Sequence, residues 1–111
     1  MKADMPEIND DRIEFVKGLF QDTLYNFIER NKTKLAGRLV INLDADLFSA
    51  TIFALATLNP YLKKGDIIMF DEFNVPNHEY LAYKIFTESF PIKLKLAAAR
   101  LNFYHTAFVV E

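Results

Sequence analysis

The feature of this sequence that most constrains its fold is a pair of apolar segments separated by one amphipathic segment. The first, RLVINLD, covers residues 38–44, and the second, DIIMFDEF, covers residues 66–73. Nearly continuous apolar runs of this length are typical of strands that are buried on both faces of a parallel sheet. The segment between them carries large apolar residues at helical spacing: Phe48, Ile52, Leu55 and Leu58. Together these segments predict a β-α-β unit with a right-handed crossover.

The remaining segments extend this unit into an α/β chain. A short strand is expected over residues 12–18, helices over 19–31 and 78–90, and two strands after residue 91. From Ile92 to Leu96 apolar residues alternate with lysines, which indicates an edge strand with one wet face. The predicted order is β-α-β-α-β-α-β-β, a partial Rossmann-like sheet that is mostly parallel and ends in an antiparallel hairpin. Residues 1–11 are expected to form a flexible leader, and residues 12–111 the single domain.

Composition excludes several classes of protein. The chain has 111 residues, no cysteine and a formal net charge of −2. Disulfides, thiolate zinc sites and cysteine nucleophiles are therefore excluded, and the charge gives no reason to expect nucleic-acid binding. No apolar run is long enough to cross a bilayer, and the acidic N-terminal residues do not resemble a secretory signal. We therefore expect a cytoplasmic protein with no nucleic-acid or membrane partner.

Acidic residues follow both apolar strands. Asp44 and Asp46 come after the first, and Asp71 and Glu72 after the second. In an open α/β sheet, ligands bind beyond the carboxyl ends of the strands, and neighbouring strands would bring these acids to one edge. Several carboxylates without cysteine suit a hard cation such as Mg²⁺ better than zinc. Two acidic strand ends side by side could therefore hold a metal ion and a reactive hydroxyl group.

A purely structural explanation of the same acids stays open. Asp46 is well placed to cap the helix that starts near residue 47, and Asp71 with Glu72 can be ordinary loop residues. The two histidines, His78 and His105, are far apart in sequence, and neither has a ligand partner at helical spacing. We expect a structural or solvent role for both.

Several motifs in this order resemble a known family. They are FVKGLFQDTL, DADLF, SAT, PYLKKGD and FDEF, and the likeness extends over about residues 12–88. The sequence resembles the carboxyl-terminal half of the macrocin O-methyltransferases, class I S-adenosylmethionine-dependent enzymes that methylate hydroxyls on natural-product sugars. The resemblance implies that Asp44, Asp71 and Glu72 bind a divalent cation and that Asp46 is the base. Family members with a histidine base carry it where this chain has Leu47.

One part of the family pattern is missing. The glycine-rich turn that binds the cofactor has no counterpart, because the three glycines, Gly18, Gly37 and Gly65, are isolated. By this resemblance the chain begins at the third of seven strands, and strands four, five, seven and six would form the remaining sheet, in that order. Strand four would then be an exposed apolar edge.

The missing part determines what we expect of the isolated chain. S-adenosylmethionine should bind only if a missing N-terminal half is supplied, so the isolated chain should not be catalytic. A second copy (a homodimer or larger homo-oligomer) or a complementary chain should cover the exposed edge. The acceptor would be a small molecule with a hydroxyl group. The alternative function is a non-catalytic, oligomerising α/β module derived from a methyltransferase.

Overall fold

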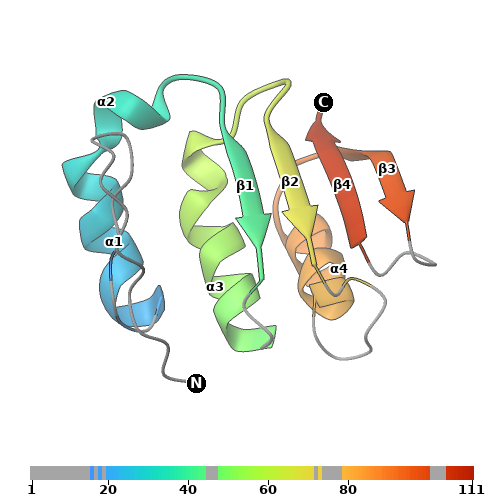
Figure 1. The fold of residues 1–111 in the computed structure, drawn as a ribbon, viewed down its shortest axis with the longest axis horizontal. Helices are drawn as coiled ribbons and strands as arrows, with labels where there is room; N and C mark the ends of the chain where they lie inside the picture. Colours follow the sequence, from blue (N-terminus) through green and yellow to red (C-terminus); the bar gives the residue numbers. More distant parts are fainter. Residues whose placement is uncertain are drawn as a thin grey trace.

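The computed structural model describes residues 16, 18, 20–44, 48–71, 73, 79–100 and 105–111. Its elements run in the order α1 (Phe20–Arg30), α2 (Lys32–Leu35), β1 (Val40–Leu43), α3 (Phe48–Leu58), η1 (Asn59–Tyr61, a 3₁₀ turn), β2 (Ile67–Phe70), α4 (Glu79–Ser89), β3 (Leu94–Arg100) and β4 (His105–Val110) (Figure 1). These elements confirm the order expected after residue 18. The leader and most of the strand expected over residues 12–18 lie outside the described residues. No helix in the described part of the chain is long and apolar enough to cross a membrane.

The four strands form one mixed sheet in the order β1-β2-β4-β3. Strands β1 and β2 are parallel, whereas β4 is antiparallel to both β2 and β3. This arrangement confirms the predicted terminal hairpin and the predicted order four, five, seven, six. A bulge between Leu96 and Ala98 shifts the register of β3 against β4. Strand β1 is at one edge of the described sheet and β3 is at the other.

The hydrophobic core lies between one face of the sheet and helices α3 and α4, which run behind the strands in Figure 1. Its buried members are Leu43, Ala54, Leu55, Ile68, Phe70, Phe73, Ala82, Phe86 and Phe108. Phe70 and Phe108 meet edge to face with ring centroids 5.8 Å apart, and Tyr83 stacks on Phe108 at 4.7 Å. Helix α1 adds a further layer by packing against α3. Burial of these aromatic rings stabilises the sheet against its helices.

The expectation that the first two strands are buried on both faces is wrong for the described residues. Val40 is 61% exposed, and Asn42 is also exposed. The physical reason is that α3 and α4 pack on the same face of the sheet, so the described residues leave the other face without a helical layer. Parallel strands are usually covered on both faces. The uncovered surface is called the open face below.

The turn before β2 is fixed by a buried carboxylate. Asp66 is 1% exposed; its Oδ1 accepts the Leu39 N–H at 2.9 Å, and its Oδ2 accepts the Lys63 N–H at 2.8 Å. The Lys63 ammonium lies 3.3 Å from Oδ2. Burial acts to raise the pKa of Asp66, but the two N–H donors and the ammonium outweigh it and lower the pKa below its ordinary value. Asp66 therefore joins the start of β1 to the start of β2.

Candidate functional site

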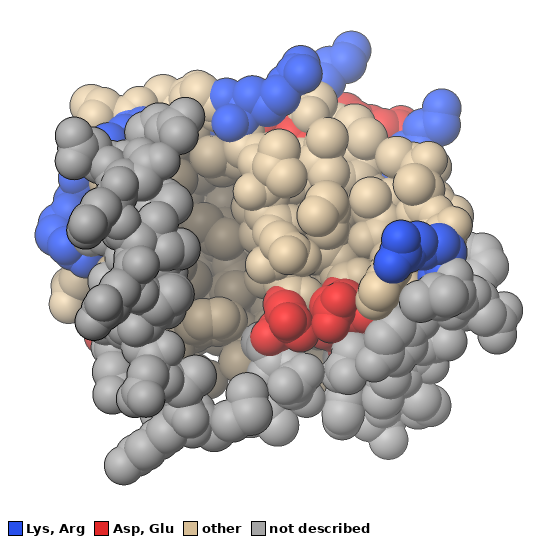
Figure 2. Space-filling model, viewed as in Figure 1, with Lys and Arg blue, Asp and Glu red and all other residues tan. Residues whose placement is uncertain are grey.

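The carboxyl ends of β1 and β2 bring two of the predicted acids to the same edge of the sheet. Leu43 and Phe70 are register partners, and the next residues along the chain are Asp44 and Asp71. The Asp71 N–H donates to the Leu43 carbonyl at 3.1 Å, which continues the parallel pairing by one residue. Figure 2 shows acidic side chains gathered at the lower edge of the open face, beneath a largely uncharged surface. The prediction that the two strand ends are neighbours is confirmed.

Only part of the predicted set of acids lies within the described residues. Asp46, the predicted base, and Glu72, the third predicted metal ligand, lie outside the described residues, as does His78. Within the described ranges no group of three or more His, Cys, Asp or Glu side chains is arranged to hold a metal ion. Asp44 and Asp71 provide carboxylate oxygens, the donor type that Mg²⁺ prefers. Their chemistry fits this ion, and the complete ligand set stays a prediction.

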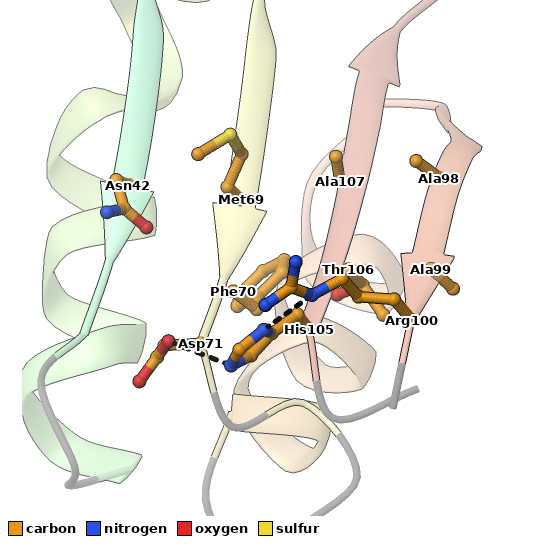
Figure 3. A pocket seen from close by; sticks show the side chains of 10 residues that line it. All are labelled: Asn42, Met69, Phe70, Asp71, Ala98, Ala99, Arg100, His105, Thr106 and Ala107. Atoms are coloured by element: carbon orange, nitrogen blue, oxygen red, sulfur yellow. Dashed lines mark hydrogen bonds and ion pairs between the residues drawn. The ribbon is translucent and has the colours of Figure 1, made fainter. Parts of the chain in front are cut away.

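A cavity of about 510 Å³ lies on the open face beside these acids. Met69 and Ala107, which are register partners on β2 and β4, point into it, and Ala98 of β3 extends its apolar floor (Figure 3). The polar end of the cavity is formed by Asp71, His105 and Arg100. The cavity thus combines an apolar surface with one charged end, an arrangement that suits an organic ligand with a polar group.

His105 belongs to this site, although only a structural or solvent role was expected of it. Its Nε2 lies 3.3 Å from Asp71 Oδ1, and its Nδ1 accepts a hydrogen bond from Arg100 Nε at 3.3 Å (Figure 3). The signal that sequence reasoning missed is the register of the hairpin. Pairing residue 100 with residue 105, and placing the last strand beside β2, would have put His105 next to Asp71.

The glycines of the chain do not form a cofactor-binding turn. Gly18 precedes α1, Gly37 precedes β1 and Gly65 precedes β2, so none follows the carboxyl end of β1 or β2. Gly65 has a positive φ of 93°, and its N–H donates to the Val110 carbonyl at 2.8 Å. This glycine is used to make the turn into β2. A glycine-rich phosphate or nucleoside cradle of the kind found after a first Rossmann strand is not built from these three residues.

Comparison with known proteins identifies the family. The family model for macrocin O-methyltransferase (TylF) matches residues 4–100. The chain belongs to this family. The match is wider than the region of about residues 12–88 in which the sequence motifs were found.

Two similar proteins are named as sugar O-methyltransferases, and both are much longer than this chain. The 8-demethyl-8-(2,3-dimethoxy-α-L-rhamnosyl)-tetracenomycin-C 4′-O-methyltransferase of Streptomyces olivaceus is 37% identical over 67 residues, which are 60% of this chain and 23% of that protein. The apo structure of a TDP-rhamnose 3′-O-methyltransferase of calicheamicin biosynthesis matches with a TM-score of 0.66 and 25% identity. That match covers 85% of this chain and 39% of the solved one. The chain therefore has a methyltransferase-like α/β fold and spans less than two-fifths of either relative.

Proposed function

We propose that this chain is the acceptor-activating part of a Mg²⁺-dependent sugar O-methyltransferase that uses S-adenosylmethionine. The observation that carries the proposal is the position of Asp44 and Asp71 at adjacent strand ends within a macrocin O-methyltransferase chain. Both relatives are named as O-methyltransferases that act on rhamnose-containing molecules. A hydroxyl of a sugar or of a similar small natural product is accordingly the acceptor that we propose.

The chemistry assigned to this chain is deprotonation and orientation of the acceptor hydroxyl. Asp44 and Asp71, together with Glu72, would hold the cation, and Asp46 would remove the proton. A Mg²⁺ ion held by these residues would lower the pKa of the acceptor hydroxyl and fix its orientation. S-adenosylmethionine, when bound, would supply the methyl group, and Asp46 would accept the proton of the acceptor hydroxyl. The sulfonium methyl is already activated, so the acidic residues need only prepare the nucleophile.

The cofactor itself does not fit this chain alone. None of its three glycines lies where a strand end would cradle S-adenosylmethionine. We therefore expect the isolated chain to bind Mg²⁺ but not to bind S-adenosylmethionine well. Methyl transfer would require polypeptide beyond these 111 residues, as the greater length of both relatives suggests.

Isothermal titration calorimetry tests this proposal. Mg²⁺ should bind the wild-type chain, and Asp71→Asn should weaken that binding because it removes one anionic ligand. Asp22→Asn is the matched control, because Asp22 is an exposed acid on α1 and the substitution changes the net charge equally. If neither Mg²⁺ nor S-adenosylmethionine binds at high concentration, the enzymatic role of this chain is wrong.

The second candidate function is a non-catalytic oligomerising module, and the position of β1 at one edge of the sheet that the described residues form favours it. Strand β1 has the uncharged sequence VINL, and Val40 is 61% exposed. Edge strands without charge or proline pair readily with another chain. A second copy or a complementary chain would cover this edge under either function, so oligomerisation together with absent Mg²⁺ binding would support the module.

Analytical ultracentrifugation tests the expected self-association. The wild-type chain should sediment with at least twice the 12.9 kDa mass of one chain. Val40→Lys should shift it to the monomer, because a lysine on an edge strand disfavours pairing with a strand of another chain. Ile85→Lys is the control, since Ile85 is also an exposed apolar residue but lies on α4. A wild-type chain that stays monomeric at high concentration would exclude self-association. A complementary chain would then be the remaining candidate to cover the edge of β1.

A further inference from the structure

The sheet register brings together three side chains that the proposed chemistry does not yet use as a unit. Arg100 of β3 and His105 of β4 are register partners, so their side chains lie on the same face of the sheet. Phe70 of β2 pairs with Thr106 of β4 in antiparallel register. Because Asp71 follows Phe70 and His105 precedes Thr106, the continuation of this pairing sets Asp71 opposite His105. The three polar side chains form a row across β2, β4 and β3 (Figure 3).

The backbone that carries these side chains is fixed because adjacent residues are buried in the hydrophobic core. Phe70 is 1% exposed and Thr106 is 4% exposed, and both lie between the sheet and its helices. Their neighbours Asp71 and His105 point the other way, into the cavity of the open face. The side chains of Asp71 and His105 are 42% and 32% exposed. A rigid backbone thus carries side chains that a ligand can reach.

The hydrogen bond from Arg100 determines what His105 can offer to Asp71. Arg100 Nε donates to His105 Nδ1 at 3.3 Å, and a nitrogen that accepts a hydrogen bond carries no proton. The N–H of the ring is then on Nε2, the atom that lies 3.3 Å from Asp71 Oδ1. An N–H at this position can orient the Asp71 carboxylate. The second oxygen, Oδ2, stays available to a cation or to an acceptor hydroxyl.

We propose that His105 is a positioning residue that orients the Asp71 carboxylate, and that Arg100 sets the His105 tautomer. This inference rests on the proposed function in one respect, namely that Asp71 is a cation ligand. Groups that donate hydrogen bonds to ligating side chains fix their orientation, and their loss commonly costs metal affinity. The competing explanation is an ordinary exposed pair that has no measurable effect.

The first arm of the test measures the orientation of Asp71 without any cation. Scalar couplings between the α and β protons of Asp71, measured by NMR, report how its χ1 rotamers are populated. The wild-type chain should show one dominant rotamer, and His105→Ala should show averaged couplings. His105→Gln is the conservative control, because its terminal amide can place an N–H near the position of Nε2 and should restore the single rotamer. Equal couplings in the wild-type chain and His105→Ala would overturn the proposal.

The second arm measures Mg²⁺ affinity by following the amide signals near residues 44 and 71. His105→Ala should bind Mg²⁺ about tenfold more weakly than the wild-type chain. His105→Gln should keep most of the affinity. If the wild-type chain does not respond to Mg²⁺, the cation role of Asp71 is wrong, whereas the positioning role is still decided by the couplings. The two failures are therefore distinguishable.

A third variant separates Arg100 from His105. Arg100→Leu keeps an apolar side chain at this position but removes the donor to Nδ1. The ¹⁵N shifts of the His105 ring should then indicate a mixture of tautomers, where the wild-type chain shows the Nε2–H form alone. An unchanged tautomer in Arg100→Leu would show that Arg100 does not set it, and that part of the proposal would be withdrawn.

Discussion

The two ends of strand β2 carry the same residue type in opposite surroundings. Asp66, just before the strand, is 1% exposed and accepts two backbone N–H groups. Asp71, just after the strand, has a side chain that is 42% exposed and lies beside a cavity. Because Asp66 is saturated by donors from its own fold, it serves to hold strands together. Asp71 retains open coordination space and can serve a ligand, so the surroundings rather than the residue type separate a structural acid from a functional one.

The largest expected effect is the loss of stability when Asp66 is neutralised. Asp66→Asn replaces one carboxylate oxygen with an NH₂ group, so one of the two backbone donors, Leu39 N–H or Lys63 N–H, loses its acceptor. Leaving such a buried group unpaired should lower the free energy of unfolding by about 2–3 kcal/mol. Urea unfolding at neutral pH measures this loss. A loss below about 0.5 kcal/mol, the range of ordinary surface substitutions, would contradict the structural role.

Acid should reduce the difference between the wild-type chain and Asp66→Asn. The folded-state pKa of Asp66 is lowered by the Leu39 and Lys63 donors, despite the opposing effect of burial. A carboxyl with a lowered pKa stabilises the fold fully above its unfolded-state pKa, which is about 4 for Asp. That stabilisation falls as the pH decreases through the folded-state pKa. Urea unfolding of both proteins from neutral pH down to below pH 4 should show the two stabilities converging, and a constant difference would contradict the assignment.

The sequence was sufficient for the elements and the sheet order because both follow from strong local patterns and from the family resemblance. The apolar runs ended close to the observed strands β1 and β2, and the lysine alternation identified β3 as an edge strand. The sequence was less reliable about which side chains of a helix face the core. In helix α4, Ile85 is 37% exposed, whereas Ala82 and Phe86 are fully buried. Periodicity gives the spacing of a buried stripe, but the packing of the neighbouring strands selects which residues form it.

For the site, the sequence indicated the acids at the strand ends but did not indicate His105. Asp44 and Asp71 could be predicted because acids at strand ends form a recognisable pattern within a β-α-β unit. His105 could not be found in this way, since it reaches Asp71 only through the antiparallel pairing of β4 with β2, whose paired residues are more than thirty positions apart in the chain. Asp66 was overlooked for a related reason, because its partner Leu39 lies before β1.

The smallest expected effect on stability belongs to Asp71. Asp71→Asn alters an exposed side chain whose contact with His105 lies at the surface, so the free energy of unfolding should change by no more than about 0.5 kcal/mol. Urea unfolding beside Asp66→Asn makes the comparison direct, because both substitutions replace an acid with its amide on either side of one strand. A loss for Asp71→Asn as large as that for Asp66→Asn would mean that Asp71 is also a structural acid. The proposal that it is kept for a cation and an acceptor would then lose its basis, whereas a small loss combined with weakened Mg²⁺ binding would separate the two ends of β2 by function.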